Sequence, residues 1–319
     1  MRRSARIAAL TSNSTSISAS TKPNRKRKAE EVSTIVSIKQ LHFHGSYIRQ
    51  NWPFRDSLIN YITKNPSNAK AWTKLIQSCK YFFAKNPVFV IDKLGHESNG
   101  WTAFLNGIQK SIDFTKISSK LWITEKFDGF NALNPPKNVS WIIPKLYKCD
   151  AKYLGLVNDV ISYEDFLFLS SNLEEIILYK CIVKKDNGSI VPLEKLVQVL
   201  PKIKSILFCE NFDETSITSN IVKELLELQH FSKIDKFELQ NIPEIFDIET
   251  FFTYLKKNKH TKFTITFVNS ISETYKNRLK EIVDEIIETE KHDYKIPNIY
   301  FGGINIEKWE KLLSIFYKH

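Results

Sequence analysis

His42 and His44 are the residues whose spacing in this sequence comes closest to a metal site. They alternate in "LHFHG" and would share one face of a strand, as two metal ligands could. No other Cys, His, Asp or Glu lies close to them in the sequence, so we interpret them as ordinary imidazoles. The four cysteines form no C-x-x-C pair, which argues against a zinc or redox motif and predicts reduced, mostly buried thiols at Cys79, Cys149, Cys181 and Cys209.

The motifs of nucleotide-dependent and nucleophilic enzymes are missing from the sequence. The chain has nine glycines, and none of the patterns G-x-x-x-x-G-K-[ST], G-x-G-x-x-G or G-x-S-x-G occurs. Acidic pairs such as Glu174-Glu175 and Asp284-Glu285 stand among lysines, which is typical of a solvated surface rather than of a catalytic acid and base. We therefore expect a protein that is not an enzyme and that needs no metal or other cofactor.

The positive charge is concentrated at the N-terminus. Of the formal net charge of +11, residues 1–41 contribute +7, from nine Lys or Arg against two Glu, and the other 278 residues contribute +4. Because Lys and Glu are interspersed in that larger part, we do not expect it to bind nucleic acid. No apolar run approaches the ~18 residues of a membrane span, so we expect a soluble, intracellular protein.

Residues 1–45 are expected to form a disordered, basic tail, because residues up to about 40 are rich in Ser and Thr and include no aromatic residue. The tail contains two candidate targeting signals. Arg25, Lys26, Arg27 and Lys28 follow a proline and could be read by a nuclear import receptor, or they could be an ordinary solvated charge run. The absence of acidic residues from the first 29 positions is also a feature of mitochondrial transit peptides. We therefore expect the compartment to be nucleus or cytoplasm, with mitochondria as the lesser alternative.

The stretch "PFRDSLINYITKNPSNAKAWTKLIQSCKYFF" predicts two short amphipathic helices. The first has an apolar face formed by Leu58, Ile59 and Ile62. The second has apolar residues at helical spacing: Trp72, Leu75, Ile76, Cys79 and Phe83. We expect Asn65 to be the N-cap of the second helix, with Pro66 at its first position. The pair, assigned to a module of residues 46–92, ends before the strand-like "VFVI".

A second pattern begins near residue 137, after a stretch at 93–136 that we expect to be an irregular connection. Short runs of β-branched and large apolar residues are each followed by a helical pattern of 10–15 residues, as in "KSILFCENF" and then "NIVKELLELQHF". The centres of successive runs lie about 30 residues apart: Ile177, Leu207, Phe237, Ile265 and Ile299. Such a period predicts an α/β fold in which residues 137–319 form a stacked strand–helix array, a solenoid.

These units resemble degenerate leucine-rich repeats, in the segments "LEEIILYKCIV" and "DKFELQNIPEIF". Cys181 and Asn241 stand at the position where that repeat has Asn or Cys capping the backbone, and Cys209 is near it. The helical pair resembles an F-box, with Pro53 in the place of the proline of its Leu-Pro opening and "CKYF" matching its close. Trp52 replaces the usual leucine before that proline, and the repeats lack a regular consensus.

The phrases "PFRDSLINYI", "KLIQSCKYFF", "IIPKLYKCDAKYL" and "IPEIFDIETF" resemble a nematode-expanded family of F-box-like proteins with divergent repeats. The resemblance implies a substrate receptor whose helical pair docks a Skp-type adaptor of a cullin ubiquitin ligase and whose repeats bind a target protein. The residues expected to meet the adaptor are Pro53, Phe54, Leu58, Ile59, Ile62, Leu75 and Ile76. The alternative is a repeat-type binding protein in which the pair is only an N-terminal cap.

Overall fold

The computed structural model of the protein describes residues 51–129, 139–211 and 214–318. They belong to a single compact unit. The tail expected at residues 1–45, with its basic run and with His42 and His44, lies outside the described residues. Within the described ranges, no helix is both long and apolar enough to cross a membrane.

Nine α-helices and thirteen strands make up the described part of the chain. The helices are α1 (Asp56–Lys64), α2 (Ala69–Ser78), α3 (Lys80–Lys85), α4 (Tyr163–Ser170), α5 (Leu193–Gln198), α6 (Ile221–Glu227), α7 (Ile248–Leu255), α8 (Glu273–Glu288) and α9 (Ile306–Lys318). Two 3-10 turns are η2 (Ile143–Lys145) and η3 (Phe231–Lys233). The strands are β1 (Val88–Glu97), β2 (Gly100–Leu105), β3 (Ile108–Ser111), β4 (Lys120–Asp128), β5 (Leu146–Cys149), β6 (Tyr153–Val157), β7 (Val160–Ser162), β8 (Glu175–Tyr179), β9 (Ile182–Lys184), β10 (Ser205–Cys209), β11 (Lys236–Ile242), β12 (Lys262–Phe267) and β13 (Asn298–Tyr300).

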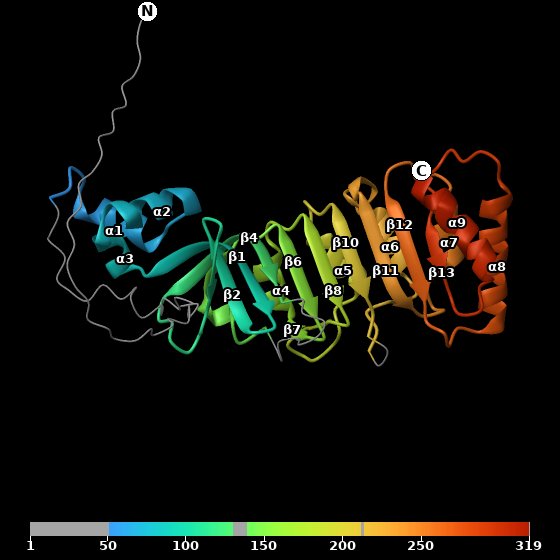
Figure 1. Cartoon of the computed structure of the whole chain (residues 1–319), viewed down its shortest axis with the longest axis horizontal. Helices are drawn as coiled ribbons and strands as arrows, with labels where there is room; N and C mark the ends of the chain where they lie inside the picture. Colours follow the sequence, from blue (N-terminus) through green and yellow to red (C-terminus); the bar gives the residue numbers. More distant parts are fainter. Residues whose placement is uncertain (1–50, 130–138, 212–213, 319) are drawn as a thin grey trace, which may run out of the picture. The chain divides into compact units, whose positions relative to one another are not determined.

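One large, mostly parallel sheet organises the chain. Its strand order is β13-β12-β11-β10-β8-β6-β4-β1-β2-β3, and β5 pairs beside β4. From β4 to β13 the paired strands are parallel and follow one another in chain order (Figure 1). The strands β1, β2 and β3 form an antiparallel meander at the other end, while β7 and β9 form a small sheet of their own. The expected mixed α/β class is confirmed.

The register of the parallel strands agrees with the 30-residue period of the sequence. Ile177 pairs with Leu207, and Ile265 pairs with Ile299. Phe237 pairs with Ile206, one residue away from the expected centre of β10. That single residue matters, because adjacent residues of a strand point to opposite faces.

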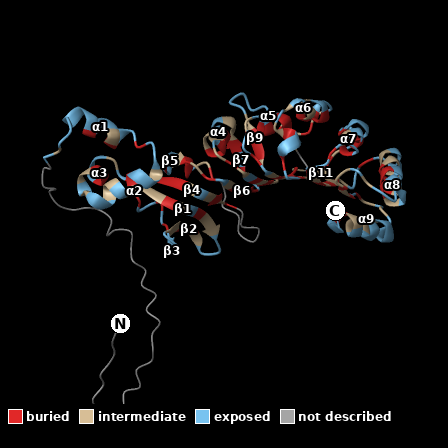
Figure 2. Ribbon diagram, turned by 90° about the horizontal axis from the view of Figure 1, so that it is seen from above, coloured by how far each residue is buried: buried red, intermediate tan, exposed pale blue. Residues whose placement is uncertain are grey.

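Helices α4 to α8 cover one side of the sheet (Figure 2). Alternate strand residues point toward them and are almost fully buried: Ile176, Leu178, Ile206, Phe208, Phe237, Leu239, Phe263 and Ile265. Burial of such apolar side chains between sheet and helices is the main source of stability, at about 1.5–3 kcal/mol for a large side chain. The strand–helix order of the sequence is thereby explained, because each unit covers its apolar strand residues with its own helix.

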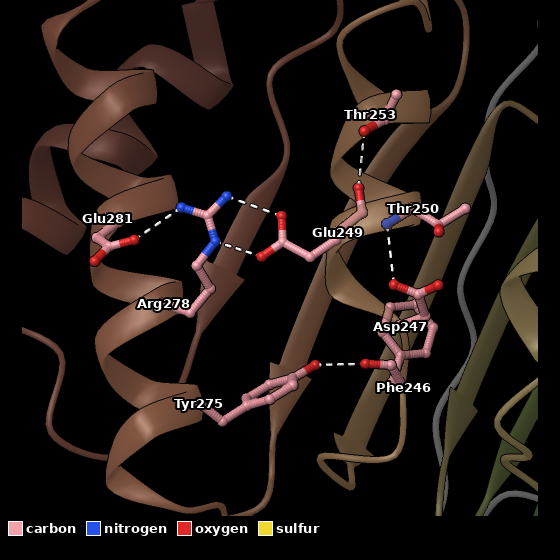
Figure 3. A network of polar contacts seen from close by, with 8 residues as sticks. All are labelled: Phe246, Asp247, Glu249, Thr250, Thr253, Tyr275, Arg278 and Glu281. Carbon is pink, nitrogen blue, oxygen red and sulfur yellow. Dashed lines mark hydrogen bonds and ion pairs between the residues drawn. The ribbon is translucent and has the colours of Figure 1, made fainter.

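Polar contacts join neighbouring helices on this side. Figure 3 shows Arg278 of α8 donating to the carboxylate of Glu249 in α7, with its Nη2 at 2.8 Å from Glu249 Oε2. In the same view the Tyr275 hydroxyl donates to the carbonyl oxygen of Phe246 at 2.7 Å, and the Asp247 carboxylate caps α7 by accepting from the Thr250 N–H at 3.0 Å. Arg278 holds the pKa of Glu249 below its usual value.

The stretch 93–136, expected to be irregular, contains regular strands throughout much of its described part. It holds the second half of β1 and all of β2, β3 and β4. Asn106 and Gly107 both have positive φ (51° and 77°), as a two-residue hairpin turn between β2 and β3 requires. Of these strands, β3 is the hardest to detect from sequence, because all four of its residues are exposed and it has no buried apolar side.

Candidate interaction surfaces

Three short helices, α1 to α3, build the N-terminal module. Asn68 caps α2, since its side chain accepts a hydrogen bond from the Ala71 N–H at 2.9 Å. Asn65 is instead the C-cap of α1, with its N–H bonded to the Tyr61 carbonyl oxygen. The prediction that Asn65 is the N-cap of the second helix and Pro66 its first residue is therefore wrong. The predicted second helix also divides, because Cys79 is extended and α3 begins after it.

The inner side of the module packs against the sheet. Ile59, Trp72 and Phe82 form a small core with Val88 of β1 and Trp122 of β4. The Trp72 indole N–H donates to the Val88 carbonyl oxygen at 3.0 Å, which satisfies the one polar atom of a side chain that is 1% exposed. The module is therefore attached to the sheet through a core of its own, separate from the main one.

The outer side of the module exposes apolar side chains. Phe54, Leu58 and Tyr61 are 58%, 44% and 65% exposed, and we call these three residues the outer strip. Leu58 and Tyr61 are three residues apart on α1 and therefore share a face, and Phe54 lies in the bend just before the helix N-cap, Arg55. Beside the strip lies a cavity of about 140 Å³ lined by Tyr61, Ile62, Asn65, Pro66, Ser67, Asn68, Ala71, Trp72 and Leu75.

The expected contact residues differ in burial and fall into three groups. Pro53, Phe54 and Leu58 are exposed, whereas Ile59 is only 5% exposed and belongs to the small core. Ile62, Leu75 and Ile76 are half-buried, and Leu75 and Ile76 pack against that core from its edge. Sequence reasoning missed Tyr61, the most exposed residue of the strip, although its position three residues after Leu58 was a usable signal.

The module is also strongly basic. Residues 51–87 hold six Lys or Arg and one Asp, which leaves a formal charge of +5. Lys64, Lys70 and Lys74 are exposed on α1 and α2. A partner that covers the outer strip would meet this charge at its rim, so an acidic partner surface is favoured.

The side of the sheet opposite α4 to α8 is the second candidate surface, which we call the open face. In one row across the strands, Gly155, Ile177, Leu207 and Glu238 lie side by side. Ile177 and Leu207 are only half-buried, as are the aromatic residues of the neighbouring rows, Tyr153 and Tyr179. The open face thus has an apolar, aromatic centre with polar residues toward β11 and β12.

Each end of the open face carries further side chains. At the β13 end, the Trp309 indole of α9 donates to Asn298 Oδ1 at 3.2 Å, so α9 lies over that end. At the β4 end, the Lys126 ammonium lies 4.1 Å from the centre of the Tyr153 ring and 2.7 Å from Asp128 Oδ2. Burial, with the carboxylates of Asp128 and Glu175, raises the pKa of Tyr153. A cavity of about 250 Å³ beside this cluster is lined by Lys93, Leu94, Gly95, His96, Glu97, Phe104, Lys126 and Asp128.

The turns after the strands show what the expected capping residues do. Asn241 has a φ of 60°, and its side chain donates to the carbonyl oxygen of Glu210 in the preceding unit at 3.2 Å. Its amide also lies 3.2 Å from the Cys209 sulfur. Cys181 instead contacts the carbonyl oxygen of Tyr179, in its own unit, at 3.5 Å. Asn241 therefore joins consecutive units, and the Cys181 thiol also meets the preceding unit through the backbone of Asp159.

Buried carboxylates occupy structural positions. Asp159 accepts hydrogen bonds from the N–H groups of Val139 and Val160 at 2.7 and 2.8 Å. Glu210 accepts from the N–H and hydroxyl of Ser216 at 2.8 and 2.5 Å. Burial raises the pKa of both carboxyls despite these bonds. Each closes a loop through backbone donors, so neither is arranged as a catalytic acid or base.

The cysteines are free thiols. All four lack a disulfide: Cys79, Cys149, Cys181 and Cys209. Burial raises the pKa of Cys149 to about 11 and that of Cys181 to about 12, which makes both poor nucleophiles at neutral pH. In the part of the chain that the structure describes, no three His, Cys, Asp or Glu side chains come together as a metal site would require.

The fold and its surfaces define a mixed α/β protein with a large, mostly parallel sheet, an apolar strip on its N-terminal helices and an open sheet face. Comparison with protein-family models, with curated proteins and with solved structures finds no match.

Proposed function

We propose that the protein is an interaction scaffold that docks a Skp-type adaptor of a cullin ubiquitin ligase and holds a target protein on its open face. The observation that carries the proposal is the outer strip. Phe54, Leu58 and Tyr61 stay exposed although the inner side of their module is buried against β1 and β4. An apolar helix face beside a cavity suits a partner that binds helices in a hydrophobic groove.

The arrangement of the sheet supports the second half of the proposal. Parallel strands that follow chain order, with their helices on one side, are the layout expected of a leucine-rich-repeat-like solenoid. Asn241 bonding to the preceding unit agrees with the capping role that the resemblance implies. The target would then meet Ile177 and Leu207 at the centre of the open face, with the tyrosines beside them.

Calorimetric titration of the purified protein with a purified Skp-type adaptor tests the docking role. Leu58→Asp places a charge in the outer strip and should weaken binding by at least about tenfold, as expected for a central apolar contact. Leu167→Asp is the matched control, because Leu167 on α4 is 40% exposed and lies outside the module. Adaptor binding that is absent in the wild type, or weakened equally by both variants, would remove the docking role.

The alternative is a binding protein without ligase function, whose module only caps the sheet. The specific observation in its favour is the core that the module shares with the sheet, including the hydrogen bond from Trp72 to Val88. A cap requires the inner side of the module and not the outer strip. The alternative would be favoured if the wild-type protein does not bind the adaptor and Leu58→Asp is as stable as the wild type.

A further inference from the structure

The strand β3 forms a free edge of the large sheet. It is the last strand in the pairing order, beyond β2 (Figure 2). All four of its residues are exposed, and Ile108 is 60% exposed. No described element covers its outer side. Because the unpaired backbone groups of an edge strand can accept another strand, such edges in natural proteins are either protected or used for binding.

The direction of the backbone groups follows from the pairing of β2 with β3. The Ile112 N–H donates to the Trp101 carbonyl oxygen at 2.8 Å, so these two residues form a hydrogen-bonded pair. Hydrogen-bonded and non-hydrogen-bonded pairs alternate along an antiparallel ladder. The N–H and C=O of Lys110 therefore face β2, whereas those of Gln109 and Ser111 face away from the sheet. Two N–H donors and two C=O acceptors are thus presented along the edge.

The hairpin holds this edge in place before any partner binds. Its turn has Asn106 and Gly107 in the left-handed region, and the Asn106 N–H donates to Asp92 Oδ2 at 2.9 Å. The Gln109 side chain donates to Glu97 Oε1 on β1 at 2.8 Å. A strand fixed at both points loses little conformational freedom when it gains a neighbour.

A second copy of the chain is a poor occupant of the edge. An antiparallel, two-fold pairing of β3 with itself that uses the outward groups of both Gln109 and Ser111 must be centred on Lys110. The two Lys110 side chains would then lie directly opposite each other, and like charges in that position repel. A lysine on an edge strand is a common protection against such self-association.

The same lysine indicates which strand would fit. Within the described residues, no carboxylate forms an ion pair with Lys110. Ile108 lies two residues away and therefore on the same face. We propose that the β3 edge binds an extended segment of another protein that places a carboxylate opposite Lys110 and an apolar side chain opposite Ile108. The site is independent of the adaptor docking proposed above.

A synthetic peptide, acetyl-Ser-Val-Thr-Glu-Thr-Val-Ser-amide, is the probe for this site. Bound antiparallel, it places Glu opposite Lys110 and Val opposite Ile108 and Ile112. Binding is followed by the amide resonances and hydrogen exchange of the ¹⁵N-labelled full chain. The amides of Gln109 and Ser111 should gain protection from exchange, while that of Lys110, already bonded to β2, should not change. Protection without this alternation, or no effect on β3, would overturn the proposal.

Two substitutions separate strand pairing from other contacts. Gln109→Pro removes one outward N–H without removing a bond to β2, and proline is tolerated at such edge positions. Gln109→Ala is its matched control, since it loses the same side chain but keeps the N–H. Peptide binding should fall severalfold in Gln109→Pro relative to Gln109→Ala, and equal binding would contradict the pairing.

Charge provides the second comparison. A peptide with Lys in place of Glu should bind the wild type about tenfold more weakly, and Lys110→Glu should reverse this order. Leu58→Asp should bind the acidic peptide as the wild type does, which keeps this result distinct from a failure of adaptor docking. A preference of the edge for a second copy, seen as dimers of the wild type that Gln109→Pro dissociates, would refute the proposed partner.

Discussion

Ile59 and Leu58 are adjacent on α1, but substitution should lower the stability of the protein strongly at Ile59 and hardly at all at Leu58. Ile59 is 5% exposed in the small core with Trp72 and Phe82, so Ile59→Ala removes buried carbons and leaves a cavity. Comparable substitutions cost about 2–5 kcal/mol, and we expect about 3 kcal/mol here because the core is small. Leu58 is 44% exposed in the first turn of α1, where the carboxylate in Leu58→Asp meets the positive end of the helix dipole. Its effect should lie within about 0.5 kcal/mol of zero.

Hydrogen exchange measured along the chain, together with urea denaturation, distinguishes these effects. Because the module has a core separate from the main one, Ile59→Ala should lower protection in α1 to α3 first and leave β8 to β12 protected. Leu58→Asp should leave both regions unchanged. Equal loss of protection in the two variants would refute the assignment of inner and outer sides, and with it the proposed outer strip.

Three further changes test the interior and the joints between units. Asn241→Ala loses the bond to the preceding unit and places alanine at a φ of 60°, so urea denaturation should show a loss of about 2 kcal/mol. Asn241→Gly loses the same bond without the backbone strain and should cost about 1 kcal/mol. Burial raises the pKa of Glu210, so the wild type should lose stability as pH rises from about 4.3 through that raised value. Glu210→Gln cannot ionise, so it lacks this loss, although it also gives up an acceptor for Ser216 and can start from a different stability at pH 4. The stability of the variant relative to that of the wild type should therefore increase with pH. Denaturation midpoints measured from pH 4 to 8 would show a constant difference between the two proteins if the reasoning is wrong. Arg278→Ala should cost at most about 0.5 kcal/mol, since the pair with Glu249 is largely exposed, and the cost should shrink in high salt if it is electrostatic.

The parallel half of the sheet could be predicted because each strand combines a buried apolar side with a regular distance to the next strand. Ile177 and Leu207 were expected as strand centres and are paired in the structure. Both faces of these strands carry apolar residues, so the period gave the strands but not the side that each residue faces. Strand β3 of the antiparallel meander escaped prediction for the opposite reason, because all four of its residues are exposed.

Local signals also competed in the module. Asn65-Pro66 and Asn68 are both acceptable helix starts by residue type, and the structure uses Asn68. Pro66 is buried and lines the cavity beside the outer strip, so its position is set by packing rather than by helix capping. A sequence rule that considers one turn at a time has no information about that packing.

The separation of Leu58 from Ile59 is the step on which the proposed function depends, and it is decided by residues far away in the chain. Helical periodicity places Leu58, Ile59 and Ile62 on one broad apolar face, and any of them could have been buried. Trp122, more than sixty residues later, packs against Ile59 through the small core and thereby fixes which part of that face turns inward. What is left outside is the outer strip, so the docking surface of α1 is defined by the sheet behind it as much as by its own sequence.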